Sequence, residues 1–199
     1  MRLKKMRELA LIIAILFSQA AWADEFSDAL SAYQKEDYST ALVKFRSLAQ
    51  QGKVSGQHHL GEMYYFGLGV PQDYKEAMRW YTLAAQQGLF LSQYALGRMY
   101  YNGQGVAQDY KEAMRWWKLA AQQGDVSAQH NLGLLYGLGR GVLQDNTRAH
   151  MWFNIAAARG DKDSVKLRDA AARVMTPQEV PEAQRMAREC MDSNFKKCD

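Results

Sequence analysis

A short stretch with the pattern Gly-x-Gly-Val-x-Gln-Asp occurs three times in the chain. The copies begin at Gly67, Gly103 and Gly139, so each lies 36 residues after the one before. Self-similarity at a fixed period of this length is typical of repeat proteins, in which copies of one supersecondary unit stack and share a core. A single copy would suggest a phosphate-binding turn, whereas three copies at one spacing indicate a structural connector.

The period divides most of the chain into three full repeats, residues 53–88, 89–124 and 125–160. In each repeat, apolar residues recur at the i, i+3 and i+4 spacing of an amphipathic helix on both sides of the connector. Leucine, tyrosine and tryptophan are expected to form the buried face, while glycine and alanine let neighbouring helices approach closely. Each repeat therefore predicts two antiparallel helices.

The connector carries signals for the end of one helix and the start of the next. Its glycines permit backbone angles that other residues avoid, and its valine is expected to reach the core. The aspartate that closes each copy predicts an N-cap, and Glu76 and Glu112, three residues after the first two aspartates, predict capping boxes. Arg148 replaces this glutamate in the third copy. The second helices are expected to end at Gly88, Gly124 and Gly160.

Shorter helical segments flank the full repeats. Residues 24–52 predict a shortened opening repeat of two amphipathic helices, the second capped by Asp37. Beyond the third repeat the periodicity fails, and residues 161–199 predict two capping helices whose polar surfaces close the exposed end of the stack. Thr176 and Glu179 have the spacing of a capping box at the start of the last helix.

Residues 1–23 have the three parts of a secretory signal peptide: a basic start, an apolar run over residues 9–17 and an Ala-x-Ala cleavage site at residues 21–23. The apolar run is shorter than the roughly 20 residues that span a bilayer, so an uncleaved anchor is the weaker alternative. No cysteine stands directly after the cleavage site, which argues against a lipoprotein. We therefore expect a periplasmic or secreted protein with no transmembrane anchor after cleavage.

The charge of the chain depends strongly on this signal segment. The full sequence has 25 basic and 21 acidic residues and a pI near 9.0. Removing residues 1–23 takes away four basic residues and one acidic residue, which leaves 21 against 20. A nearly neutral chain without a basic run lacks the electrostatic footprint of a nucleic-acid-binding protein, so no nucleic-acid partner is expected.

The two cysteines of the chain, Cys190 and Cys198, lie in its last ten residues. In an exported protein, an isolated pair with no histidine nearby in sequence favours a disulfide over a metal site or a catalytic thiol. The bond would hold the C-terminal tail, which otherwise tends to fray.

The repeat pattern is plainest in residues 110–124, Tyr-Lys-Glu-Ala-Met-Arg-Trp-Trp-Lys-Leu-Ala-Ala-Gln-Gln-Gly, and in residues 127–136, Ser-Ala-Gln-His-Asn-Leu-Gly-Leu-Leu-Tyr. It resembles the SEL-one-like repeat, the bacterial relative of the tetratricopeptide repeat, closely over residues 53–160 and loosely over residues 24–52. The resemblance implies an all-α fold, a right-handed α-solenoid of antiparallel helix pairs with about ten helices.

The resemblance also implies an adaptor, regulatory or assembly role through protein binding, and in some pathogens contact with host proteins. Some secreted, cysteine-rich members of the family are linked to β-lactam or cell-wall binding, and their cysteine pairs lie inside each repeat. This chain has no such internal pairs. A cell-wall fragment or β-lactam-binding or hydrolysing enzyme of the cysteine-rich type stays as the alternative function.

The sequence offers few candidates for catalysis or for metal and cofactor binding. It has no nucleophile elbow, no zinc-protease motif and no P-loop, because Lys-Ser or Lys-Thr never follows the connector glycines. His58 and Glu62 have the i, i+4 spacing of a helical metal pair, but His130, in the same column as His58, lies two repeats away. Helices pack about 8–10 Å apart, which puts the two histidines beyond the reach of one ion. No metal, cofactor or catalytic residue is predicted, and the histidines, His150 included, are expected to be exposed or half-buried.

What remains is a binding surface on the first helices of the repeats, which line the concave face if the repeats stack as tetratricopeptide repeats do. Positions expected to be exposed there carry aromatic, amide and arginine side chains, which suit a protein or an extended peptide as partner. Tyr65 and Tyr101 either bind or only complete the packing between repeats. The candidate partner-binding residues are His58, Glu62, Tyr65, Tyr94, Arg98, Tyr101, Asn102, His130, Asn131 and Leu134.

A second candidate surface is the outer face of the second helices, with the basic residues Lys75, Arg79, Lys111, Arg115 and Lys118. It could face an acidic partner or anionic lipid, or simply be solvated. The sequence as a whole predicts an exported protein-interaction scaffold, adaptor or regulator of the bacterial envelope, which binds its partner on the concave face without chemistry.

Overall fold

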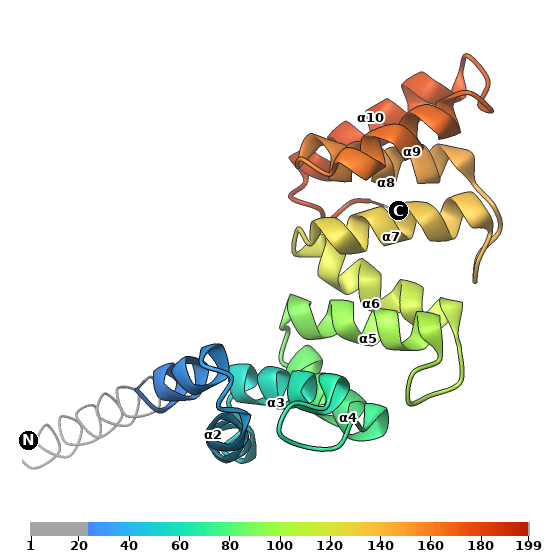
Figure 1. The fold of residues 1–199 in the computed structure, drawn as a ribbon. Helices are drawn as coiled ribbons and strands as arrows, with labels where there is room; N and C mark the ends of the chain where they lie inside the picture. Colours follow the sequence, from blue (N-terminus) through green and yellow to red (C-terminus); the bar gives the residue numbers. More distant parts are fainter. Residues whose placement is uncertain (1–23, 199) are drawn as a thin grey trace, which may run out of the picture. The chain divides into compact units, whose positions relative to one another are not determined.

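The computed structural model of the protein describes residues 24–198, which form helices joined by turns without any strand among them. Helical residues 24–34 come first, and Figure 1 shows the helices that follow. These are α2 (Tyr38–Gln50), α3 (Val54–Phe66), α4 (Tyr74–Gln86), α5 (Phe90–Asn102), α6 (Tyr110–Gln122), α7 (Val126–Leu138), α8 (Asn146–Ala158), α9 (Lys162–Ala172) and α10 (Glu179–Asp192). The predicted all-helical repeat fold is confirmed. The predicted signal peptide, residues 1–23, lies outside the described residues.

The contacts of the chain divide it into two compact units, an N-terminal unit that ends at Ala84 and a C-terminal unit that begins at Ala85. The core of the N-terminal unit includes Phe45, Leu48, Leu60, Met63 and Trp80. The core of the C-terminal unit includes Trp117, Leu132, Leu135, Trp152 and Ile155. Both cores use the leucine and aromatic columns that the period predicts.

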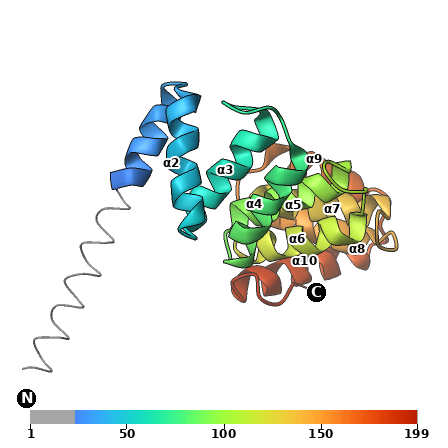
Figure 2. The same cartoon turned by 90° about the horizontal axis from the view of Figure 1, so that it is seen from below.

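In the C-terminal unit, each helix from α5 to α8 packs against the next one along the chain. The contacts join α5 to α6, α6 to α7, α7 to α8 and α8 to α9, and α10 returns to α8. Figure 2 shows α5, α7 and α9 along one side of this unit and α6, α8 and α10 along the other. The first helices of successive repeats therefore share one face.

A glycine in the first helix of each repeat leaves room for an aromatic ring of the second helix. A Cβ atom at Gly97 would lie 2.3 Å from the indole ring of Trp117. A Cβ atom at Gly133 would lie 2.6 Å from the ring of Phe153. Since real contacts are never this short, only glycine lets the two helices of a repeat pack through this ring.

The aspartate at the end of the connector caps the second helix, as predicted. The Asp109 carboxylate accepts hydrogen bonds from the N–H groups of Lys111 and Glu112, at 2.8 and 3.1 Å. The reciprocal half of the capping box expected at this connector does not form, so that prediction is wrong, whereas the capping box expected at Thr176 and Glu179 is confirmed. The Asp109 N–H donates instead to the carbonyl oxygen of Tyr100 at 2.9 Å. The Glu112 carboxylate is thus left to accept from Arg115 Nε at 2.9 Å.

The connector glycines have separate tasks. Gly103 ends α5 in the left-handed backbone region, with φ of 69°. Gly141 also has positive φ, and a Cβ atom there would lie 2.7 Å from the carbonyl carbon of Tyr110 at the start of α6. The connector of one repeat therefore rests directly on the second helix of the repeat before it.

The C-terminal tail folds back onto the stack. Cys190 of α10 and Cys198 form a disulfide. Phe195, between them, is buried, and its ring lies 3.6 Å from where a Cβ atom of Gly124 would stand. The guanidinium of Arg159 lies 5.3 Å from the centre of the same ring. The disulfide loop therefore seats an aromatic anchor at the end of α6.

Candidate functional site

A hollow of about 230 Å³ opens on the shared face of α5 and α7. We call it the aromatic hollow, and its lining residues are Tyr94, Arg98, Tyr101, Asn102, Trp117, Asn131 and Leu134. All but Trp117 are candidate residues from the sequence. The structure thus brings together side chains that the repeat period alone only placed in columns.

The aromatic wall of this hollow is held from behind. Trp117 Nε1 donates a hydrogen bond to the main-chain carbonyl oxygen of Tyr94 at 3.2 Å. The rings of Tyr94 and Trp117 are stacked with their centres 6.5 Å apart, and the Tyr101 ring lies 5.4 Å from Trp117. Because these rings support one another, the wall keeps its shape without a ligand and costs little entropy on binding.

Tyr101 also takes part in a contact with the next connector. Its hydroxyl accepts a hydrogen bond from Arg140 Nη1, and the Arg140 guanidinium lies 5.6 Å from the centre of the Tyr101 ring. The side chain of Tyr101 is half-buried and lines the hollow. Packing and exposure to a ligand therefore coexist at this tyrosine.

Polar side chains surround the aromatic wall. Arg98 and Asn102 lie one helical turn apart on α5 and are exposed, while Asn131 of α7 is half-buried. No carboxylate is among the described residues that line this hollow. The guanidinium of Arg98 therefore sets the sign of the local charge, and it favours an anionic or polar group of a ligand.

A second hollow, of about 190 Å³, adjoins the first, and we call it the acidic hollow. Its lining residues are Tyr94, Val126, Ser127, His130, Asn131, Asp161 and Asp163. Tyr94 and Asn131 belong to both hollows. The two recesses therefore form parts of one continuous surface.

Asp161 is fixed at the floor of the acidic hollow. Its Oδ2 accepts a hydrogen bond from the Ser164 N–H at 2.9 Å, and this bond caps α9. The same oxygen lies 3.0 Å from His130 Nδ1. His130 Nδ1 is also 2.8 Å from the Ser164 hydroxyl. Burial raises the pKa of Asp161, but the hydrogen bonds from Ser164 and His130 outweigh it and leave the pKa below its ordinary value. The carboxylate is therefore ionised at neutral pH.

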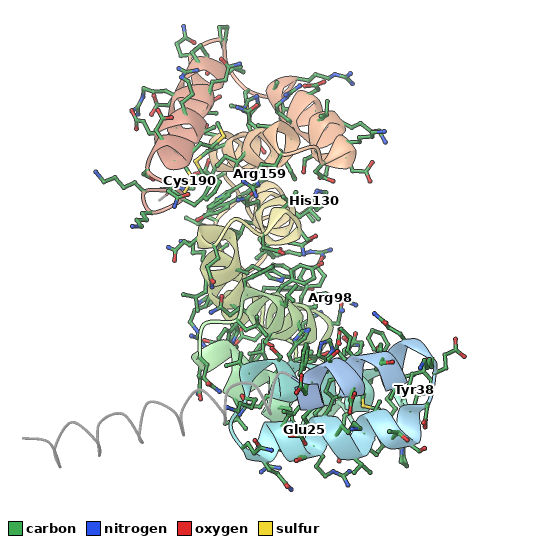
Figure 3. The ribbon with its side chains drawn as sticks, turned by 90° about the vertical axis from the view of Figure 1, so that its left-hand side faces the viewer. Glu25, Tyr38, Arg98, His130, Arg159 and Cys190 are labelled. Atoms are coloured by element: carbon green, nitrogen blue, oxygen red, sulfur yellow. A yellow bond between two sulfur atoms is a disulfide. The ribbon has the colours of Figure 1, made fainter. Side chains whose placement is uncertain are left out.

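A third hollow, of about 170 Å³, continues between α7 and α9, and we call it the apolar hollow. Leu134 belongs to both the aromatic and the apolar hollow. The lining residues are Leu134, Gly137, Leu138, Asn146, Ala149, Phe153, Leu167 and Ala171. Together the three hollows make up what we call the groove, and Figure 3 shows Arg98 and His130 on the same side of the C-terminal unit, away from Cys190.

The remaining candidates, His58, Glu62 and Tyr65, lie on α3 in the N-terminal unit, and the expected exposure of His58 is wrong. Its side chain is 7% exposed, with its ring centre 5.6 Å from that of Tyr81 in α4. Burial lowers the pKa of His58 to about 4, although the nearby Glu62 carboxylate acts in the opposite direction. His58 is therefore a neutral part of the core between α3 and α4.

The other two α3 candidates are occupied within their own unit. The Glu62 carboxylate lies 2.7 Å from His59 Nδ1. The Tyr65 ring packs 5.2 Å from the ring of Tyr74 and is half-buried. None of the hollows described above includes them.

His150, expected to be exposed or half-buried, is only 2% exposed. It lies on α8, which packs against α7, α9 and α10 and is therefore covered on nearly every side. Burial lowers the pKa of His150, so its ring is held neutral in the core.

The basic outer face is less open than the sequence indicates. Arg79 pairs with Glu76 at 2.9 Å and lies over the ring of Trp80, 4.9 Å from its centre. Arg115 repeats this arrangement in the next repeat, 4.3 Å from the centre of the Trp116 ring. These arginines therefore cover tryptophans and are partly neutralised, which favours a solvated face.

Within residues 24–198, no group of three or more His, Cys, Asp or Glu side chains lies close enough together to hold a metal ion. No helix in the same part of the chain combines the length and apolar character needed to cross a membrane.

Sequence reasoning missed several lining residues of the groove. Trp117 lies on the second helix of its repeat. Its signal in the sequence was an aromatic residue directly after the tryptophan column, and its ring packs against Gly97. Asp161 and Asp163 lie beyond the last full repeat, where the columns end. The Asp-x-x-Ser pattern at residues 161–164 was the available signal, since it predicts an N-cap at the start of a further helix.

Comparison with known proteins agrees with this architecture. The family model described as the Sel1 repeat matches residues 54–89, 91–125 and 126–161. No curated protein sequence matches the chain.

Solved structures also resemble the chain. A Sel1 repeat protein from Oxalobacter formigenes is 38% identical with a TM-score of 0.59, and the match covers 65% of this chain and 97% of that one. A protective antigen with an SLR fold from uropathogenic Escherichia coli is 25% identical with a TM-score of 0.52, covering 78% of this chain and 42% of that one. Cysteine rich protein B of Helicobacter pylori, 21% identical with a TM-score of 0.50 over 62% of this chain and 93% of that one, shares the fold alone.

Proposed function

The chain belongs to the Sel1 repeat family, whose members are helical-repeat scaffolds for protein interaction and generally not enzymes, and we propose that it is an exported scaffold, adaptor or regulator of the bacterial envelope. It binds a partner protein in the groove on the shared face of α5, α7 and α9. The mechanism is presentation of a preformed surface, with no bond made or broken.

The observation that carries the proposal is the gathering of candidate side chains around one hollow. Aromatic rings held from behind give large contact area, and exposed arginine and amide groups give direction to the contact. Tyrosine and arginine, here Tyr94, Arg98 and Tyr101, are enriched where protein interfaces gain most of their binding energy. Asn102, Asn131 and Leu134 line the same hollow beside them.

Export is supported by the tail and by the sequence. The disulfide between Cys190 and Cys198 is the kind of bond that forms and persists in oxidising compartments such as the periplasm. The basic, apolar and Ala-x-Ala segments of residues 1–23 supply the expected route. Both observations favour a periplasmic or secreted protein.

Site-specific photocrosslinking in the periplasm of a Gram-negative host tests the binding surface. A photoreactive amino acid replaces Asn102, which is exposed and lines the aromatic hollow. A matched probe replaces Lys111, which is exposed on α6 and lines none of the hollows. We expect a discrete protein adduct from position 102 and none from position 111.

The adduct at position 102 is then challenged with a second change. Arg98→Ala should reduce its yield at unchanged protein level, because Arg98 lines the same hollow. Equal adducts from both positions, or an adduct at 102 that is indifferent to Arg98, would contradict the groove as the main binding surface.

The alternative function, binding or hydrolysis of cell-wall fragments or β-lactams, has its own measurement. The mature protein is incubated with a chromogenic β-lactam and with purified muropeptides. A scaffold should give neither turnover nor saturable binding, whereas turnover by the purified protein would show an enzyme.

A further inference from the structure

We propose that the groove selects an extended segment of its partner that carries an acidic side chain for the aromatic hollow and a basic side chain for the acidic hollow. This inference rests on the proposed function and adds the chemistry of the partner. The carrying observation is that the two adjoining hollows have charges of opposite sign.

The charge separation follows from which residues line each hollow. Arg98 is the charged residue of the aromatic hollow, while Asp161 and Asp163 are the carboxylates of the acidic hollow. Tyr94 and Asn131 line both and thus mark the junction. A ligand that crosses this junction therefore meets a cation on one side and carboxylates on the other, which favours a segment with complementary charges.

The junction suits a peptide backbone. Asn131 offers both an amide donor and an amide acceptor, which matches the N–H and C=O groups of a main chain. Tyr94 contributes an aromatic face supported by Trp117, whose ring is 6.5 Å away and stacked. An extended chain can therefore hydrogen-bond and pack at the centre while its side chains reach the two charged recesses.

The geometry at Arg98 favours an acidic side chain over a chain terminus. A terminal carboxylate is usually captured by free backbone N–H groups in a turn or at a helix start. Arg98 and Asn102 lie in the second half of α5, where the backbone N–H groups are already used within the helix. The aromatic hollow therefore offers side-chain donors, which a carboxylate in the middle of a segment reaches equally well.

The acidic hollow keeps capacity for a cation. Asp161 Oδ2 carries the contacts to the Ser164 N–H and to His130 Nδ1, and the Asp161 side chain is 28% exposed. Asp163 pairs with Lys166 at 2.8 Å, but both side chains are more than 70% exposed. Since exposed pairs of this kind are weak and exchange readily, a lysine or arginine of a partner competes for Asp163.

Fluorescence polarisation at low salt with synthetic peptides tests the inference. Every peptide is acetylated and amidated at its ends, and carries one Glu and one Lys separated by two to six neutral residues, in either order. Matched peptides replace Glu with Gln, or Lys with Gln. We expect one spacing and order to bind best, and each neutral replacement to weaken it about fivefold.

Charge reversal in the mature protein gives the sharper measurement. Arg98→Glu should weaken the best peptide about tenfold and recover binding when the peptide Glu is replaced by Lys. Asp163→Lys should behave in the same way towards a peptide whose Lys is replaced by Glu. Asp161 is left unchanged because it caps α9. Lys111→Glu, exposed on α6, is the control and should leave all affinities unchanged.

The outcomes separate this inference from the proposed function. Recovery by both swapped pairs supports it. Binding that ignores peptide charge but is lost in the groove variants overturns the charge selection and leaves the groove as a binding surface. Absence of peptide binding, while position 102 still captures a partner, overturns the extended segment. If neither peptide binding nor a partner adduct at position 102 is observed, the proposed function is contradicted as well.

Discussion

Helices α3 and α5 hold the same place in successive repeats, yet the side chains in their equivalent columns differ in burial and in contacts. In α3, His58 is buried and the Glu62 carboxylate lies 2.7 Å from His59 Nδ1. In α5, the same two columns hold Tyr94 and Arg98, which line a hollow. The pair in α3 lies in or against the core of its own unit, and the pair in α5 lines a recess.

The difference shows that one set of positions in the repeat determines how its helices pack, and another set determines the character of its surface. The glycine of the Leu-Gly pair faces an aromatic ring in both helices, so the pairing of first and second helix is common to them. The columns that face outwards carry no such constraint. Changing two of them turns a closed surface into an open one without altering the pairing.

The largest effect should come from breaking the shared pairing in α5. Gly97→Ala places a Cβ atom 2.3 Å from the Trp117 ring, which is held by its own hydrogen bond. We expect a loss of about 3 kcal/mol, the upper end of the range for overpacking. Denaturant unfolding followed by circular dichroism measures it.

Gly137→Ala is the matched control for this change, because a Cβ atom there meets only Ala149 Cβ at 3.5 Å. It should be neutral or stabilising by up to about 1 kcal/mol, since alanine favours helix over glycine. Equal losses from both variants would contradict the role of the glycine in helix pairing.

The next effect concerns the closed surface of α3 and depends on pH. The pKa of His58 is lowered to about 4, so the unfolded chain takes up this proton near pH 6.5 and the folded chain only near pH 4. Stability should therefore fall as pH drops through this window, by about 2 kcal/mol from His58. In His58→Gln the fall should be smaller by this amount. Urea unfolding at pH 7 and pH 4.5 compares the two, and parallel losses would show that His58 is not the group concerned.

A smaller effect is expected at the contact between Tyr101 and Arg140. Removing either partner, by Tyr101→Phe or Arg140→Met, should cost about 1 kcal/mol, the usual value for one hydrogen bond. The double variant should cost little more than either single one, because both remove the same interaction. Additive losses in chemical denaturation would place the two residues in separate interactions.

The smallest effect on stability should come from the open surface itself. Arg98 is exposed, so Arg98→Ala should change the free energy of unfolding by less than about 0.5 kcal/mol. The yield of the photocrosslinked partner should nonetheless fall. If Arg98→Ala unfolds the protein, or if it captures as much partner as the parent protein does, the distinction between α3 and α5 is contradicted.

The fold was largely predictable because its determinants are local and repeated. Helical spacing, the caps at Asp109 and Asp145 and the glycines at helix ends act within a few residues of themselves. The capping box expected at Asp109 failed for a tertiary reason, since the Tyr100 carbonyl takes the N–H that Glu112 needed, whereas the capping box expected at Thr176 and Glu179 forms. Spacing along the chain does not reveal a competitor nine residues away.

For the site, the sequence predicted which residues share one face of the repeats, but not how deeply each of them is buried. Tyr94, Arg98 and Asn131 were found because the repeat places them on one face. The period carries no information on how far a neighbouring helix covers each column, and so His58 was expected to be exposed. Asp161 was missed because it follows the last full repeat, although it packs beside His130.

The tail loop also changes how the end of the chain would bear a mechanical load. A pull on the C-terminus reaches Cys198 and passes through the disulfide to Cys190, so the segment between them carries no tension. Phe195 stays seated under such a pull until α10 itself leaves α8. The disulfide therefore keeps the load off the buried contact of Phe195. A tether attached beyond Cys198 would pull directly on α10.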